Sequence, residues 1–354
     1  MTEAGATERA THFASLDWLR GVAALLVFGL HVTADTPAKP FFARGYLAVD
    51  LFFVISGFVL AQSYERLMMQ PGGLARFAKV RWVRLHPMII LASSIGLVGW
   101  RLGQVPTHHP IVLLLAHILF MPNWWYGWTL FLFNGPQWSL LLEVLGNAAH
   151  ALTARWLSIR VLIMVVAIDA VALIVAARHY GDLSLGWALP NFAGGVARLV
   201  FGYASGVLIF RLHQHGRLRW PTTPGWLVVV LPFLLLAPGA IADRWYVDVV
   251  AVAAMPLAVV VALGAAMPRL LRRAGHMLGR LSYPLYAIHA PLLTVAAGLF
   301  GSAALASPMR LSLLAVAVLA LAALVERYYD APLRRFLTAV LAIAPARTPA
   351  ATAP

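Results

Sequence analysis

The sequence contains no cysteine and few charged residues. Without cysteine there is no disulfide framework, no thiolate nucleophile and no metal site with thiolate ligands. Charged residues make up 11% of the 354 positions, against about 25% in typical soluble proteins. No glycine-rich phosphate loop and no G-x-S-x-G nucleophile elbow occurs. The loop histidines have no carboxylate at ligand spacing, so we predict no metal site.

Hydrophobic residues dominate what remains. They make up 61% of the chain, and the mean hydropathy is +0.81. This predicts an all-α, polytopic transmembrane helical bundle. The apolar runs lie at about 17–35, 46–64, 86–100, 111–126, 137–154, 160–177, 191–210, 225–240, 246–266, 282–303 and 309–328.

The excess of basic over acidic residues, 27 against 13, falls mainly in alternate short loops. The positive-inside rule produces this pattern, so we expect no nucleic-acid partner. The basic loops near Arg81 and Arg155 both favour the cytoplasm. Three apolar runs lie between them, and three full crossings would put the two loops on opposite sides of the membrane. We therefore predict about ten spans, both termini cytoplasmic, and one re-entrant or broken element, either 86–100 or 111–126. Residues 1–335 would form one membrane domain, and 336–354 a short Ala/Pro-rich cytoplasmic tail.

Several ionisable residues lie inside the apolar runs, where they are costly and often functional. Arg20 and His31 lie on nearly the same face of the first run, roughly 16 Å apart along the axis. With the N-terminus inside, His31, Asp50 and Glu143 share a depth below the outer face. A histidine with a carboxylate partner suits a general base, and either carboxylate could orient it. The alternative is that each is a buried polar group satisfied by a neighbouring helix.

Four arginines are candidates for binding the substrate or donor. Arg81 and Arg84 are spaced i,i+3, so they can face one target together. Arginine binds phosphate in a bidentate manner, although this cluster could serve only as a topology signal. Arg20 could equally be a snorkelling residue at a helix end. Arg198 lies in the middle of an apolar run and needs an anionic partner or a wet cavity.

Motifs along nearly the whole chain resemble the acyltransferase type 3 family. They are Arg20-x10-His31 within LDWLRG…H, GYLAVDLFFVISGF, Arg81-Trp-Val-Arg84-Leu-His-Pro87, Gln137-Trp-Ser-Leu-Leu-Leu-Glu143, SYPLYAIHAP and Glu326…Pro332-Leu-Arg-Arg335. This family contains bacterial integral-membrane enzymes that O-acylate sugars and other surface molecules. The resemblance implies acyl-coenzyme A as donor, a glycan as acceptor, and roles in substrate binding for Ser56, Tyr283 and His289.

Together these observations predict an acyl-CoA-dependent O-acyltransferase of the bacterial cytoplasmic membrane. It would transfer an acyl group, expected to be acetyl, to a hydroxyl of an extracytoplasmic sugar, with membrane lipid around it. The alternative is a proton-coupled transporter, because intramembrane Arg, His, Asp and Glu also form proton relays and a broken helix suits transport. The sequence leaves open the acceptor, the acyl chain length and the oligomeric state.

Overall fold

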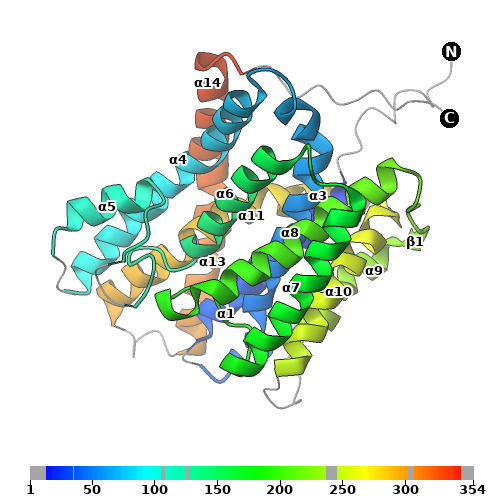
Figure 1. Ribbon diagram of the computed structural model, residues 1–354. Helices are drawn as coiled ribbons and strands as arrows, with labels where there is room; N and C mark the ends of the chain where they lie inside the picture. The colour runs from blue at the N-terminus through cyan, green and yellow to red at the C-terminus, as the bar shows by residue number, and fades with distance from the viewer. Residues whose placement is uncertain are drawn as a thin grey trace.

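The computed structural model describes residues 13–34, 36–104, 108–124, 128–236, 245–301 and 307–343. These residues form a bundle of α-helices, which confirms the predicted fold class (Figure 1). Within the described ranges the only sheet is a pair of parallel two-residue strands, β1 (Thr223–Pro224) and β2 (Ala265–Ala266).

Eight helical segments in the described ranges are long and apolar enough to cross a membrane. They are built on α1 (Ala14–Val32), α3 (Ala48–Met68), α4 (Gly73–Leu102), α7 (Ile159–Tyr180), α8 (Phe192–Gln214), α10 (Trp245–Leu263), α11 (Arg269–Phe300) and α13 (Pro308–Val325). Short helices precede two of them: α2 (Lys39–Phe42) and η3 (Gly45–Leu47) before α3, and η4 (Leu189–Asn191) before α8. The π-helical turn η5 (Glu326–Asp330) joins α13 to α14 (Ala331–Val340), so the boundary expected at residue 335 falls inside a helix.

Two shorter helices account for the difference from the ten expected spans. Helix α6 (Gln137–Thr153) has 17 residues and α9 (Gly225–Leu236) has 12. Seventeen residues is the lower limit for a span. Helix α6 is therefore at the limit, and the twelve residues of α9 are too few to cross, so the described residues contain eight clear spans against the ten expected.

The broken element is the run 111–126. Run 86–100 lies inside the continuous helix α4, whereas α5 (Pro110–Ile118) has only nine residues. His117, near the end of α5, links this helix both to α6 and to the non-helical chain between them. Gln137 donates from Nε2 to the His117 carbonyl at 2.6 Å, and the Phe133 amide donates to Nε2 of His117 at 3.2 Å. Irregular backbone at membrane depth is tolerated where protein covers it in this way.

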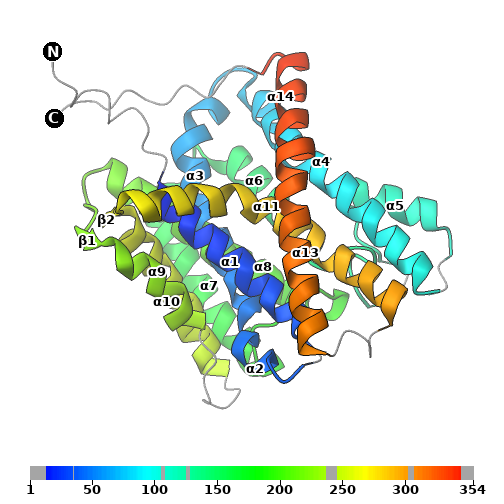
Figure 2. The same cartoon turned by 180° about the vertical axis from the view of Figure 1, so that it is seen from behind.

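The helices pack as two closely associated groups. In the first, α11 packs against both α1 and α4, and in the second α3 packs against α8 (Figures 1 and 2). Glycines allow the second contact. A Cβ added at Gly206 would lie 2.1 Å from the Val54 carbonyl oxygen, and one added at Gly57 would lie 2.1 Å from that of Tyr203. Small residues at such contacts let transmembrane helices approach closely. Helices α7 and α13 are largely exposed and apolar, as expected of lipid-facing helices.

Candidate functional site

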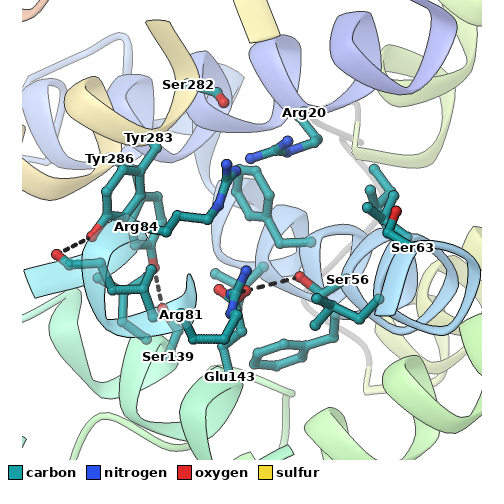
Figure 3. Close-up of a pocket in the computed structure, with 18 of the residues that line it drawn as sticks. Arg20, Ser56, Ser63, Arg81, Arg84, Ser139, Glu143, Ser282, Tyr283 and Tyr286 are labelled. Carbon is teal, nitrogen blue, oxygen red and sulfur yellow. Dashed lines mark hydrogen bonds and ion pairs between the residues drawn. The ribbon is translucent and has the colours of Figure 1, made fainter. Parts of the chain in front are cut away.

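A cavity of about 280 Å³ lies between α1, α3, α4, α6 and α11. Its wall on α3 extends from Val49 to Tyr64, and this separation of fifteen residues corresponds to about 22 Å of helix. The cavity is therefore elongated along the bundle. Its polar side chains are those of Arg20, Ser56, Ser63, Tyr64, Arg81, Arg84, Ser139, Glu143, Ser282, Tyr283 and Tyr286 (Figure 3).

Arg20 and Arg84 extend into the same part of this cavity, from α1 and α4 (Figure 3). In the part of the chain that the structure describes, no hydrogen bond or ion pair engages either guanidinium group. The charge of Arg20 lies close enough to act on Arg84, and the carboxylates that act on Arg20 are those of Asp17 and Glu143. Two unpaired arginines around one space form a site suited to an anion, and above all to phosphate.

Arg81 differs from these two arginines because it has a partner. Its Nη2 lies 2.5 Å from Oε1 of Glu143 on α6, and Ser56 donates a hydrogen bond of 3.1 Å to the same oxygen. Both side chains of the ion pair are largely buried, at 12% and 19% exposure. Glu143 thus neutralises one arginine and leaves the cavity with an excess of positive charge.

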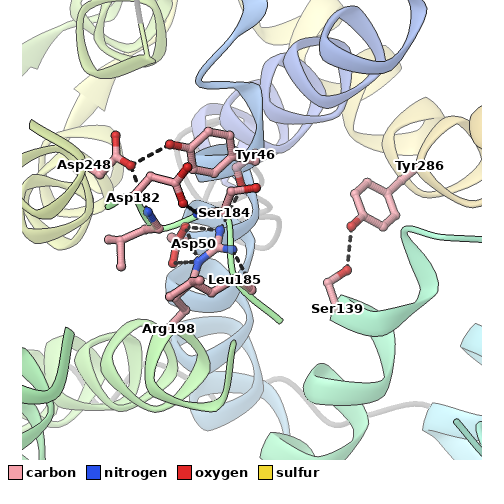
Figure 4. A network of polar contacts seen from close by, with 10 residues as sticks. Tyr46, Asp50, Ser139, Asp182, Ser184, Leu185, Arg198, Asp248 and Tyr286 are labelled. Carbon is pink, nitrogen blue, oxygen red and sulfur yellow. Dashed lines mark hydrogen bonds and ion pairs between the residues drawn. The ribbon is translucent and has the colours of Figure 1, made fainter. Parts of the chain in front are cut away.

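Two tyrosines of α11 line the wall opposite α3. Tyr283 donates to the Leu85 carbonyl at 2.7 Å and so links α11 to α4. Tyr286 shares a hydrogen bond of 2.5 Å with the Ser139 hydroxyl (Figure 4). The Tyr286 ring also lies 5.9 Å from the His289 ring, between centroids, so it separates the cavity from the histidines.

His31 and His289 form a pair next to the cavity but outside its lining. Nδ1 of His31 lies 2.9 Å from the Val27 carbonyl oxygen and 3.2 Å from Nε2 of His289. Nδ1 of His289 lies 3.0 Å from the Leu285 carbonyl oxygen. A carbonyl oxygen can only accept, so we assign the proton of each ring to Nδ1. Nε2 of His289 is then the acceptor for His31, and Nε2 of His31 keeps a free lone pair.

Asp50 and Arg198 form a separate, fully buried ion pair, with both side chains at 0% exposure. Nη2 of Arg198 lies 2.6 Å from Oδ2 of Asp50, and its other donors bind the Leu185 and Tyr46 carbonyls (Figure 4). Tyr46 in turn donates to Asp248. This network joins α3, α8 and α10 to the loop before η4.

Six of the ten predicted residues therefore line one cavity: Arg20, Ser56, Arg81, Arg84, Glu143 and Tyr283. His31 and His289 lie together beside it, and Asp50 and Arg198 pair elsewhere. The predicted contact between His31 and a carboxylate is not the one that forms, because Glu143 is bound to Arg81 and Asp50 to Arg198. A shared depth fixes position along the membrane normal, whereas the helix face decides the partner.

Sequence reasoning missed Tyr286 and Ser139. Both had a usable signal, because Tyr286 lies three residues after Tyr283 and Ser139 lies four residues before Glu143. Residues three or four apart share a helix face. A face-by-face reading of the two motifs would have grouped them with the cavity.

The structure thus combines a helical membrane bundle with a cavity lined by three arginines. Comparison with known proteins gives the class: the family described as an acyltransferase domain, acyltransferase type 3, matches residues 13–327. The match covers most of the chain, which therefore belongs to this family. The assignment favours an acyltransferase over the transporter alternative.

Two bacterial relatives agree with this assignment. "Protein 2 in picA locus" of Rhizobium radiobacter is 34% identical over 194 residues, which is 48% of this chain and 96% of that protein. "Acyltransferase MdmB" of Streptomyces mycarofaciens is 30% identical over 148 residues, which is 38% of this chain and 37% of that protein. No solved structure matches the chain significantly.

Proposed function

We propose that the protein transfers an acyl group, expected to be acetyl, from a coenzyme A thioester to a hydroxyl of an extracytoplasmic sugar. The observation that carries this proposal is the elongated cavity, with Arg20 and Arg84 unpaired within it and the His31–His289 pair just beyond Tyr286. The family assignment supports acyl transfer in general, and the positive charge supports a donor that carries phosphates.

The donor's phosphates would bind Arg20 and Arg84, whose guanidinium groups have no competing partner among the described residues. Arg81 would add positive charge from the side while remaining paired with Glu143. The pantetheine arm would then lie along α3 toward Tyr286, since the cavity follows that helix. This places the thioester at the end of the cavity nearest the two histidines.

His31 would act as the general base. Its Nε2 takes the proton of the acceptor hydroxyl, and the hydroxyl oxygen attacks the thioester carbonyl. The carbon–sulfur bond then breaks, the thiolate of coenzyme A takes the proton from His31, and an ester and a free thiol result. His289 would act as a positioning residue, because its Nε2 holds the Nδ1–H of His31.

The acceptor would arrive from outside the cell. His31 is near the end of α1 and is exposed, whereas Arg20 is near the beginning of the same helix. With both termini in the cytoplasm, as charge bias suggests, His31 faces outward and the arginines face the donor's side. A sugar as acceptor rests on the family resemblance, as does the bacterial cytoplasmic membrane as the location.

The test is acetyl-coenzyme A binding and turnover by the purified protein. We expect saturable binding, and release of free thiol that increases when a sugar acceptor is added. A chain that neither binds acetyl-coenzyme A nor releases thiol would contradict the proposal and favour the transporter alternative. Binding of acetyl-coenzyme A without formation of any acylated sugar would support the donor site and refute the sugar as acceptor.

A further inference from the structure

A second cavity, of about 350 Å³, lies between α4 and α6. It shares Arg81 and Leu85 with the first cavity, so the two lie on opposite sides of the same wall. Its remaining lining is almost entirely apolar and includes Phe77, Trp82 and Ala148. We call it the lateral groove. Since Trp82 is 43% exposed, the groove opens on the outer surface of the bundle.

The groove exists because α4 and α6 make little direct contact, although they border the same two cavities. The ion pair between Arg81 and Glu143 bridges the space between them. This pair forms part of the partition between the charged cavity and the lipid-facing surface. An arginine cavity separated from lipid by little more than this ion pair and Leu85 would gain from a further apolar seal, because exposing charges and water to hydrocarbon is costly.

Three buried nitrogen atoms of groove-lining residues have no hydrogen-bond partner in the part of the chain that the structure describes. They are Nδ2 of Asn147, a residue 3% exposed, Nε of Arg81 and Nδ1 of His86. The oxygen of Asn147 is already used, since it accepts from the Tyr203 hydroxyl at 3.2 Å. A buried donor without an acceptor destabilises the protein. The groove therefore matches a ligand that combines an alkyl chain with an acceptor oxygen.

The basic residues near the groove indicate which headgroup the ligand carries. Arg76 and Lys79 on α4 and Arg155 after α6 are exposed, and they lie at the ends of the two helices that border the groove. Basic residues between transmembrane helices on the cytoplasmic side favour anionic lipid headgroups. A soluble apolar ligand would gain no binding free energy from these charges. An anionic phospholipid would gain binding free energy from its acyl chain in the groove and from its headgroup beside the basic residues.

We propose that the lateral groove holds one acyl chain of an anionic glycerophospholipid from the surrounding leaflet. The ester carbonyl of the lipid accepts from Nδ2 of Asn147, and its phosphate lies among the basic residues at the helix ends. The bound chain closes the space between α4 and α6 and seals the arginine cavity from the membrane. This role is independent of the proposed acyl transfer.

The experiment measures the lipid that copurifies with the full chain. The protein is washed in mild detergent, and its lipids are extracted and identified by mass spectrometry. The variant Ala148→Phe fills the groove, and Ala149→Phe is its matched control, since Ala149 is the adjacent exposed alanine of α6 and does not line the groove. Wild type and Ala149→Phe should retain a stoichiometric anionic phospholipid, and Ala148→Phe should lose most of it. Asn147→Leu should show partial loss, because the groove stays open while the donor is gone.

Thermal unfolding of each variant in detergent shows whether it is folded, and added phosphatidylglycerol should raise the unfolding temperature of wild type but not of Ala148→Phe. Equal retention in wild type and Ala148→Phe would overturn the proposal, as would equal retention of phosphatidylcholine and phosphatidylglycerol by wild type. Displacement of the lipid by palmitoyl-coenzyme A would also overturn it, because the groove would then belong to the acyl donor.

Discussion

Nε2 of His289 lies 3.2 Å from Nδ1 of His31, so a fully buried histidine of α11 holds an exposed histidine of α1. The two residues are 258 positions apart in the sequence. Their contact depends on the close packing of α1 and α11. It engages Nδ1 of His31, so Nε2 is the nitrogen that the proposed base would use.

The first prediction separates the roles of the two histidines. A general base contributes about 10² to 10⁴ in rate, so His31→Ala should lose acylation by that factor while the protein still accumulates in the membrane. His289→Ala should lower kcat by less and leave the KM for the donor unchanged, because it only misplaces His31. His179→Ala, at an exposed position on α7, is the control. Wild-type product levels in His31→Ala would refute the mechanism.

The second prediction concerns the unpaired arginines. A charge-assisted hydrogen bond contributes about 1.5–3 kcal/mol, and 1.4 kcal/mol corresponds to about tenfold in affinity. Arg20→Ala and Arg84→Ala should therefore each weaken acetyl-coenzyme A binding by about ten- to a hundredfold. Arg76→Ala is the matched control, since Arg76 is exposed, lies outside the cavity lining and donates to the Pro71 carbonyl. Equal donor affinity in all three variants would mean that the arginines act only as a topology signal.

The third prediction assigns Asp50 to stability. Removing one partner of a buried ion pair costs about 3–5 kcal/mol, because the other charge is left unpaired. Asp50→Ala should lower both the unfolding temperature and the amount of protein in the membrane. Replacing both members, as Asp50→Leu with Arg198→Met, should recover part of the loss. A stable Asp50→Ala protein that is inactive would instead place Asp50 in the chemistry.

The fourth prediction concerns the topology of the broken element. A reporter inserted between Pro71 and Gly72 and another placed after Arg155 should lie on the same side of the membrane, because α4 crosses and α5 does not. A reporter after Gly103 should lie on the opposite side. Cysteine accessibility is a convenient measurement, since the chain has no cysteine of its own. Opposite sides for the first two sites would mean that α5 and the chain after it cross fully.

The fifth prediction concerns the side on which each substrate binds. In sealed proteoliposomes of known orientation, acetyl-coenzyme A on the side of Arg84 alone and acceptor on the side of His31 alone should give product. The elongated cavity along α3 is the reason, because it runs from the arginines toward Tyr286. Product formed only when both substrates share one side would refute transfer across the membrane while leaving the acyltransferase assignment intact.

Much of the fold could be predicted from the sequence, because burial in lipid leaves few options for the backbone. Long apolar runs predicted the spans. Two basic loops that both favour the cytoplasm are separated by three apolar runs, which predicted one broken element within 86–126. The structure places the break after α4. The choice between the two runs needed tertiary information, since the loop that follows α5 is held by contacts from α6 and α11.

The site was predicted in part. Arg20, Arg81, Arg84 and Glu143 do line one cavity, and the i,i+3 spacing of Arg81 and Arg84 had already grouped two of them. The partners of the carboxylates could not be predicted, because depth alone does not distinguish the helix faces of Asp50 and Glu143. The pairing of His31 with His289 also escaped, since it depends on a contact between the first helix and α11.

The cavity draws its walls from both ends of the chain, with Arg20 on α1 and Tyr286 on α11. During synthesis, the arginines of α1 and α4 enter the membrane before the wall that faces them exists. A nascent chain that ends before α11 thus has no enclosed cavity and no histidine pair, because residues 282–289 are still missing. The enclosed cavity and the histidine pair are therefore completed together, when α11 takes its place in the bundle.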